Sequence, residues 1–301
     1  MPAILDRLKP GTNKGPADKF SKLVYEASAL GATLPPLRAR NYTPPLPLDY
    51  GVHGRRQPGP GESFWQYRPY QPGDAPRQID WRKSGRSDQI LTREKEWAVP
   101  YPVKFLLDSR PSMRYRHSRK DPLKFTRAQV CLAALGEALL RGGEKLYLPG
   151  AGGTATDLHG LMHKLDAHGW NPHENYTPTT RCLIVAASDF LDPLPQIESQ
   201  WREWAGAGIH EAVLLQILDF SEIDLPFSGR YIFSDPNIPG NETLSIGGVE
   251  TLREAYRERI EHHCAALDSM ARRHGWHLIR HITREDTSKP LLRAVQALGG
   301  A

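Results

Sequence analysis

The sequence predicts an α/β protein with a mostly parallel sheet flanked by helices, joined to a small strand-rich module. From Tyr101 onward, apolar segments of strand length alternate with segments of helical periodicity. This alternation is typical of a parallel sheet with helices on both faces. Upstream, Gly51 to Trp97 is rich in arginine, aromatic residues and turn signals such as Gln71-Pro-Gly-Asp74, which indicates short strands joined by turns.

The sheet is predicted from five short apolar segments, each bounded by turn or helix signals. These are Val103 to Leu107, Lys145 to Leu148, Cys182 to Ala187, Glu211 to Ile217 and Trp276 to Ile282.

Helical spacing of apolar residues predicts the helices between these strands. Asp121-Pro122 is a good N-cap and first-turn pair for a helix that keeps one face apolar until Gly142-Gly143 ends it. Further helices are expected around Leu158 to Leu165, Ile197 to Trp204, Leu252 to Met270 and Leu291 to Leu298, and a short one over Lys22 to Leu30.

The predicted organisation has three parts. Residues 1–50 form an N-terminal tail, a short helix and a proline-rich connection, and residues 51–100 form the arginine and aromatic module. Residues 101–301 form the large α/β domain, interrupted by a β excursion at about 222–248.

Composition predicts a globular protein of the cytosol. The chain has 301 residues and a net charge of +5, an excess too small to prove nucleic-acid binding. The N-terminus lacks the apolar core of a signal peptide, and no run approaches the roughly 20 apolar residues of a spanning helix. Cys131, Cys182 and Cys264 lie far apart, which favours a reducing compartment.

Two carboxylates are expected to meet at the carboxyl edge of the sheet. Asp108 follows one predicted strand and Ser188-Asp189 follows another, and ligands of open α/β sheets bind at this edge. Mg²⁺ prefers oxygen ligands, so Asp108 and Asp189, with Asp219 as a third candidate, suggest a Mg²⁺ site. Ser112 offers a hydroxyl, and either Thr154 or Thr156 could approach the same edge. An aspartate after a strand is also often only a helix cap.

An ordered set of residues resembles the signature of the bacterial domain of unknown function 58 family, whose members carry a von Willebrand factor A-like domain. The matching residues are Gly54-Arg-Arg56, Pro58-Gly-Pro-Gly-Glu62, Phe64-Trp65, Arg68, Tyr70, Pro72-Gly-Asp74, Arg77, Ile79-Asp-Trp81, Ser84, Arg86, Arg93-Glu94, Asp108 to Met113, Gly143-Glu-Lys145, Ser188-Asp189-Phe190 and Leu225-Pro-Phe-Ser-Gly229.

The resemblance implies a metal-ion-dependent adhesion site, in which an Asp-x-Ser-x-Ser loop, a threonine and a later aspartate hold Mg²⁺. Asp108 and Ser112 match the ends of that loop, Thr154 or Thr156 the threonine, and Asp189 the later aspartate. Arg110 stands where the middle serine is expected. A guanidinium repels a divalent ion, but it can bridge two carboxylates and take the place of the cation. The expected site is therefore degenerate, with Arg110, Ser109 and Ser188 on an interaction rim.

The arginines of the module allow two interpretations. Arg55, Arg56, Arg68, Arg77 and Arg86, interleaved with aromatic residues such as Trp81, could stack on bases and contact phosphates. Because acids are interspersed among them, we favour arginine–carboxylate pairs that tie the module together. A partner-protein surface is compatible with either interpretation.

The expected function is protein–protein interaction without catalysis. The resemblance implies an adaptor that works beside a MoxR-type AAA+ ATPase in the assembly or maturation of a client protein. The chain has no GxxxxGK[ST] loop, so it should not itself hydrolyse ATP in the P-loop manner. The alternatives are a nucleic-acid-binding protein that uses the arginine module and a Mg²⁺-dependent phosphohydrolase that uses the carboxylates.

Overall fold

A computed structural model describes residues 16–39, 64–71, 74–95, 102–172, 174, 176–178, 182–237 and 243–299. The chain divides into two compact units. The main unit comprises residues 1–39 and 102–301, and the small unit comprises residues 40–101. Arg55 and Arg56 of the predicted module lie outside the described residues.

The main unit is built on a mostly parallel sheet, as predicted. Among the described residues, six strands form this sheet in the order β10-β7-β6-β3-β4-β5, and only β5 runs antiparallel to its neighbour. Numbered along the chain, the order is 3-2-1-4-5-6, which is that of an open doubly wound sheet. The strands are β3 (Val103–Leu107), β4 (Leu146–Tyr147), β5 (Thr154–Ala155), β6 (Leu183–Ser188), β7 (Glu211–Leu218) and β10 (His277–Ile282).

The central strands are apolar throughout because both faces of the sheet are covered. Every residue of β6 is buried, and so is every residue of β7 except Glu211. Parallel strands buried on both faces read as continuous apolar runs, which is why the sequence identifies them. Strand β3 has its predicted bounds, and β4, β6, β7 and β10 differ from theirs by one residue at most at either end.

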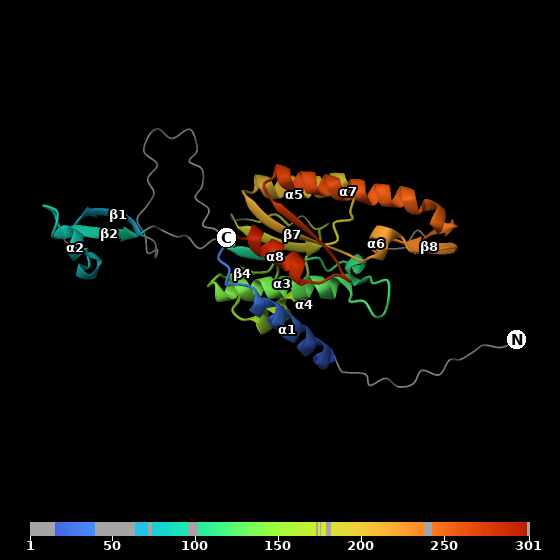
Figure 1. Cartoon of the computed structure of the whole chain (residues 1–301), viewed down its shortest axis with the longest axis horizontal. Helices are drawn as coiled ribbons and strands as arrows, with labels where there is room; N and C mark the ends of the chain where they lie inside the picture. Colours follow the sequence, from blue (N-terminus) through green and yellow to red (C-terminus); the bar gives the residue numbers. More distant parts are fainter. Residues whose placement is uncertain are drawn as a thin grey trace. The chain divides into compact units, whose positions relative to one another are not determined.

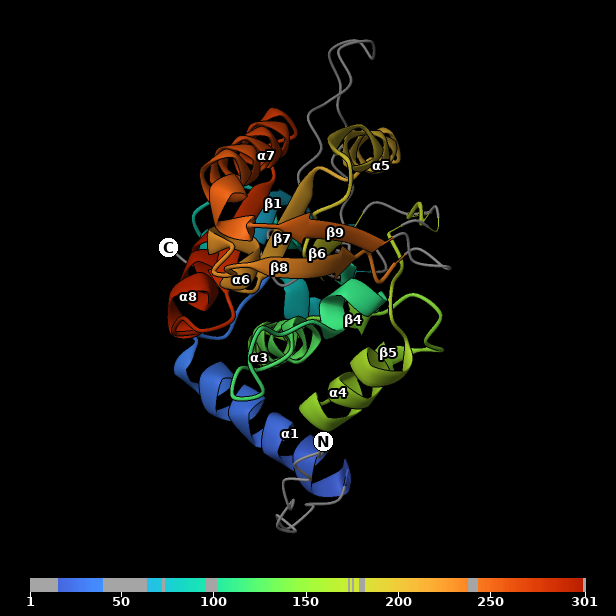
Figure 2. The same cartoon turned by 90° about the vertical axis from the view of Figure 1, so that its right-hand side faces the viewer.

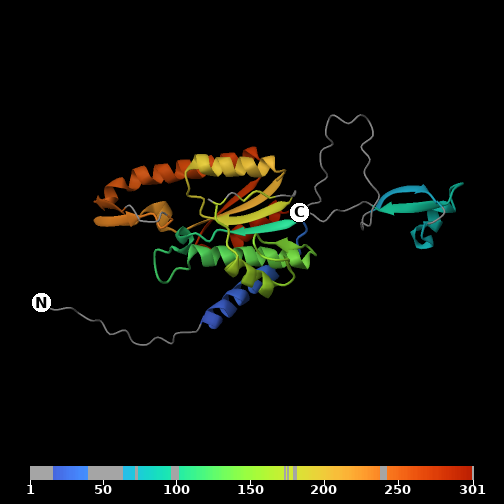
Figure 3. The same cartoon turned by 180° about the vertical axis from the view of Figure 1, so that it is seen from behind.

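Helices cover both faces of the sheet (Figures 2 and 3). One face carries α5 (Leu194–Gly206) and α7 (Arg253–Arg273), whose Trp201, Trp204 and Leu267 join strand residues in a buried cluster. The other face carries α3 (Lys124–Arg141) and α8 (Ser288–Ala297). Beyond α3 lie α4 (Leu158–Ala167) and α1 (Pro16–Thr33), which packs along α3. The first helix is therefore longer than predicted and part of the main unit.

The two ends of α3 compare differently with the sequence prediction. Gly142 is the C-cap and Gly143 has φ 89°, so the helix ends where the glycine pair predicts. The prediction of Asp121 as the N-cap is wrong, because the N-cap is Leu123 and the Asp121 carboxylate instead accepts a hydrogen bond from Arg284 at 2.9 Å.

The β excursion forms a separate hairpin at the end of the main unit, beside the short helix α6 (Ser221–Asp224) (Figure 1). Its strands β8 (Arg230–Ser234) and β9 (Thr243–Gly247) pair antiparallel. The short 3-10 helix η3 (Val249–Leu252) leads from the hairpin into α7.

The small unit contains an antiparallel pair, β1 (Phe64–Pro69) and β2 (Leu91–Lys95). Two short helical turns, η1 (Pro76–Gln78) and α2 (Trp81–Ser84), lie between the strands along the chain. Asp80 caps α2, accepting from the backbone N–H of Lys83, and also binds the Arg93 guanidinium at 2.6 Å.

Two of the three cysteines are buried, and none of the three forms a disulfide. Burial raises the pKa of the Cys131 thiol to about 12 and that of Cys182 to about 11. Both therefore stay protonated and pack as small apolar side chains. No helix in the described ranges has the length and apolar character needed to cross a bilayer.

His281 on β10 is a buried titratable group in this apolar setting. It is 1% exposed, and neither ring nitrogen has a hydrogen-bond partner among the described residues. Burial, assisted by the positive charge of Arg127, lowers its pKa from 6.5 to about 4. The folded protein therefore holds this ring in its neutral form.

His281 is expected to make the protein less stable as the pH falls. Between pH 6.5 and 4 the unfolded chain binds this proton and the folded chain does not, so the stability contribution is complete above pH 6.5 and is lost as the pH falls to 4. We expect the free energy of unfolding, measured with urea, to fall by about 3 kcal/mol more in wild type than in His281→Leu between pH 7 and pH 4. Equal losses in the two proteins would contradict this account of His281.

Candidate functional site

The candidate site lies where the sheet order reverses direction. Asp108 directly follows β3, and Ser188 ends the neighbouring strand β6, just before Asp189. From β3 the chain passes to β4 on one side, whereas from β6 it passes to β7 on the other. Open α/β sheets bind ligands in the crevice outside the carboxyl ends of the strands at this point. The structure thus brings the two predicted carboxylates to one edge.

The Asp108 carboxylate is fully buried and its hydrogen bonds come from close neighbours. It accepts from Ser188 Oγ at 2.6 Å and from Arg110 Nη2 at 2.7 Å. The Arg110 Nε also donates to both of its oxygens at 3.1 Å, and the Arg110 backbone N–H donates at 2.9 Å. Burial raises the pKa of Asp108, and the contacts with Arg110 oppose that rise.

The Arg110 guanidinium joins three aspartates. Besides Asp108 it donates to Asp192 at 2.6 Å and, from Nη2, to Asp189 at 3.4 Å. The residue is only 6% exposed. Burial alone would lower the pKa of Arg110, but its bonds to Asp108 and Asp192 outweigh burial and raise it. Arg110 is therefore a permanent buried cation at the carboxyl edge.

Lys124, the first residue of α3, supplies a second buried cation. Its side chain is 0% exposed, and its Nζ lies 2.9 Å from Asp189 Oδ2 and 2.5 Å from Glu222 Oε1. Burial acts to lower the pKa of Lys124, and the charges of Asp189 and Glu222 reverse the shift and raise it. Lys124 and Arg110 in turn hold the pKa of the buried Asp189 carboxyl below its ordinary value.

Sequence analysis missed Lys124 and Glu222. Lys124 stands four residues before Ala128 and seven before Cys131, so it is a charged residue in register with the apolar face of α3. That register is a signal of a buried, paired lysine. Glu222 gave no comparable signal, because it reaches the site from α6, a four-residue helix that no periodicity predicts.

Asp219, a candidate third carboxylate, organises the loop after β7. Its Oδ1 accepts from the backbone N–H and the hydroxyl of Ser221 at 2.9 and 2.8 Å. Its Oδ2 accepts from the backbone N–H of His117 at 3.1 Å. Asp219 therefore fixes the backbone of this loop, although the N-cap residue of α6 is Phe220.

The two loop serines have different environments. Ser109 donates from its backbone N–H to the Trp170 carbonyl at 3.0 Å, and its hydroxyl contacts the same carbonyl at 3.4 Å. Ser112 lies in the 3-10 helix η2 (Pro111–Arg114), and its backbone N–H donates to Asn237 Oδ1 at 3.0 Å. The Ser112 hydroxyl is buried and faces Asp189, whose pKa it helps to lower.

Thr154 and Thr156 do not join this cluster. Thr154 pairs with Tyr147, which pairs with Lys104, four residues before Asp108. Four strand residues span about 13 Å. Since β5 runs antiparallel, Thr156 lies still farther toward the amino edge of the sheet, where its hydroxyl contacts the exposed carboxylate of Asp157. The match of either threonine to a metal ligand is therefore corrected: β4 is too short to carry β5 to the carboxyl edge.

The oxygens that a divalent ion would need are already engaged. Both oxygens of Asp108 accept from the guanidinium, and the two oxygens of Asp189 contact Arg110 and Lys124. Two positive charges thus occupy the space between the carboxylates. As arranged, these residues do not fit a resident Mg²⁺, which needs several free oxygen ligands.

The arginines predicted on the module surface lie in the small unit and behave in two ways. Arg68 is paired with Asp74 through two bonds of 2.6 and 2.7 Å. Arg77 and Arg86 are exposed, and Trp81 is 65% exposed. The small unit therefore combines an internal arginine–carboxylate pair with an exposed tryptophan.

Removing the Arg110 charge is expected to destabilise the main unit strongly. Arg110→Met leaves Asp108 buried without its cation, and breaking such a pair costs about 3–5 kcal/mol. Arg119→Met removes an exposed arginine of the same loop. Its free energy of unfolding should stay within about 0.5 kcal/mol of that of wild type. Urea unfolding at pH 7 compares the three proteins. Equal, small effects would mean that Arg110 does not neutralise a buried carboxylate.

Comparison with known proteins gives one match. A family model described as "Protein of unknown function DUF58" matches residues 66–159, which run from β1 through the loop of Asp108 and Arg110 to the start of α4. No curated protein and no solved structure matches the chain. Over residues 66–159, the chain is similar to the DUF58 family, and the matched residues include Asp108 and Arg110 of the site.

Proposed function

We propose that this chain is a non-enzymatic interaction protein that docks a partner at the carboxyl edge of a von Willebrand factor A-like domain. The observation that carries the proposal is the buried Arg110 guanidinium between Asp108, Asp189 and Asp192. In this proposal Arg110 and Lys124 take the place of the metal ion of an adhesion site. The edge is then ordered permanently, and docking needs no divalent cation.

An exposed apolar surface beside the site supports docking of a protein. On one face of the β8–β9 hairpin, Tyr231 is 40% exposed and Leu244 is 62% exposed. Ile232, on the opposite face, is 69% exposed. Large exposed apolar side chains on a hairpin favour a protein-binding role. The hairpin turn contacts the site through Asn237, which accepts from the Ser112 N–H.

Basic residues lie next to this apolar surface. The loop between β3 and α3 exposes Arg114, Arg116, Arg119 and Lys120. It also touches the base of the hairpin, where the rings of His117 and Phe227 lie 5.4 Å apart. A partner that presents apolar side chains flanked by acidic ones would complement this surface.

The proposed partner is a MoxR-type AAA+ ATPase, with which the chain would act in the assembly or maturation of a client protein. The choice of partner rests on the family resemblance. The phosphohydrolase alternative is not proposed, because the Asp108 and Asp189 carboxylates are engaged by resident cations.

A nucleic-acid-binding role remains the second candidate on a specific observation. Trp81 is 65% exposed on the small unit, and Arg77, Arg82 and Arg86 are exposed near it in the sequence. An exposed indole among arginines can stack on a base beside phosphate contacts.

Charged substitutions on the hairpin are expected to weaken partner docking. The binding of the full chain to the purified MoxR-type ATPase of the same genome is measured by calorimetry for wild type, Leu244→Glu and Leu292→Glu. Leu244→Glu places a charge in the apolar surface and should raise Kd by about tenfold or more. Leu292→Glu alters another exposed leucine, on α8 (53% exposed), and should leave Kd unchanged.

Two outcomes would contradict the proposal. The first is no binding of the ATPase by the wild type. The second is single-stranded DNA binding that falls steeply with salt and is lost in Trp81→Ala, which would favour the nucleic-acid role.

Placing a serine at position 110 is expected to create a Mg²⁺ site. Arg110→Ser removes the resident guanidinium and completes the Asp-x-Ser-x-Ser pattern. At a hundred times its Kd, Mg²⁺ should stabilise this variant by about 2.7 kcal/mol. Wild type and Arg110→Ala should show no such gain in thermal unfolding. A Mg²⁺-dependent gain in wild type would contradict the substitution of the ion by Arg110.

A further inference from the structure

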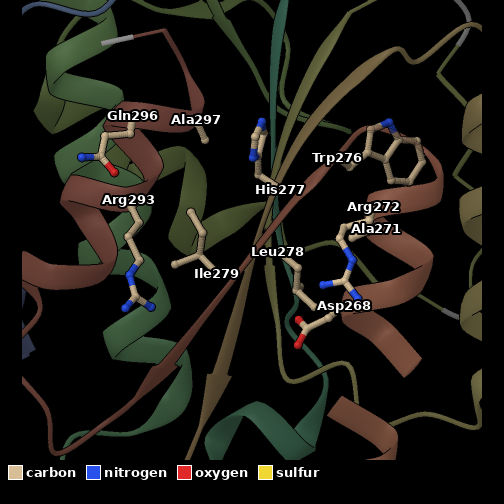
Figure 4. Close-up of a pocket in the computed structure, with 10 residues that line it drawn as sticks. All are labelled: Asp268, Ala271, Arg272, Trp276, His277, Leu278, Ile279, Arg293, Gln296 and Ala297. Carbon is tan, nitrogen blue, oxygen red and sulfur yellow. The ribbon is translucent and has the colours of Figure 1, made fainter. Parts of the chain in front are cut away.

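A groove lies at the opposite end of the sheet from the candidate site, on the outer edge of the sheet. It is a cavity of about 410 Å³ at the start of β10, between the C-terminal turns of α7 and α8 (Figure 4). Its floor contains Leu278 and Ile279 of β10. A volume of this size is in the range of ligand-binding clefts.

Strand β10 offers unpaired backbone groups to this groove. Among the described residues it pairs only with β7, so its other side is the edge of the sheet. In a parallel ladder alternate residues bond to the neighbour. Just beyond β10, the N–H of Thr283 donates to the Leu218 carbonyl at the end of β7. In this register, the odd-numbered residues of β10 form the backbone hydrogen bonds with β7. The N–H and C=O groups of Leu278 and Arg280 therefore face outward.

The groove has one exposed arginine on each side of the strand. Leu278 packs toward the buried cluster under α7. Arg272 of α7 lies on this face of the sheet, and Arg293 of α8 lies on the opposite face (Figure 4). Neither arginine has an ion-pair partner within the described ranges. The acid that lines the groove, Asp268, lies 3.5 Å from Arg280. The groove is therefore positively charged on both sides.

We propose that this groove binds an extended acidic segment of a partner protein, which adds to the sheet as a strand beside β10. The outward N–H and C=O groups of Leu278 and Arg280 supply the main-chain bonds, as in other cases of strand addition. The apolar floor receives small or β-branched side chains, and Arg272 and Arg293 pair with carboxylates.

The geometry sets the spacing of these carboxylates. Successive side chains of a strand point to opposite faces of the sheet. Because Arg272 and Arg293 flank opposite faces, the two acidic residues must be an odd number of positions apart. This site lies at the amino end of β10, away from the carboxyl edge, so the chain can hold this segment independently of the docking proposed above.

The test uses fluorescein-labelled blocked peptides and the full chain. The probe is Ser-Thr-Glu-Val-Thr-Glu-Val-Thr-Ser, with its glutamates three positions apart. An isomer with Ser-Thr-Glu-Val-Glu-Thr-Val-Thr-Ser has them two apart. Fluorescence anisotropy should show the first peptide binding about fivefold more tightly than the second. N-methylation of one alternate set of backbone amides should abolish its binding, and methylation of the other set should not.

Variants of the protein complete the test. Arg272→Glu and Arg293→Glu should each lower the affinity of the protein for the first peptide by about tenfold. Arg259→Glu reverses an exposed charge elsewhere on α7 and serves as the matched control. Equal affinity for the two isomers, equal loss in all three variants, or no binding at all would overturn the proposal. Circular dichroism confirms that each variant is folded.

Discussion

The buried ion-pair network of Arg110 with Asp108 is the constraint on which the rest of the carboxyl edge depends. Asp108 closes β3 with its carboxylate fully inside the protein, and a lone buried carboxylate is costly. Arg110 compensates it with hydrogen bonds of 2.7 and 3.1 Å. Asp189 is compensated in the same way by Lys124. The network thus joins β3 and β6 to α3 and, through Glu222, to α6.

This network also bears on the docking surface proposed beside it. Within the described residues, Asp108, Asp189, Asp192 and Glu222 surround only the cations Arg110 and Lys124. Burial raises the pKa of Glu222 despite its contact with Lys124. Each of these acids contacts Arg110 or Lys124, whereas the apolar residues of the hairpin and the basic residues of the loop are exposed. In the proposed docking, recognition depends on these exposed groups.

The sequence predicts the sheet well because its signal is local. Runs such as Cys182 to Ala187 are apolar without interruption, and the aspartates that follow two such runs reach the same edge. The position of Thr154 was beyond prediction, since it depends on β4 having only two paired residues. Lys124 carried a weak signal in its helical register, whereas Glu222 depends on a tertiary contact across 98 residues. Long-range electrostatic partners of this kind have no local pattern.

The central claim is that a guanidinium occupies the place of a metal ion between Asp108 and Asp189. The most direct measurement is a crystal structure of the wild-type chain grown with Mn²⁺, with anomalous diffraction recorded at the manganese edge. The account predicts density for the Arg110 guanidinium between the carboxylates and no anomalous peak at the carboxyl edge. A peak at about 2.1 to 2.2 Å from Asp108 and Ser112 oxygens, with Arg110 turned outward, would contradict it.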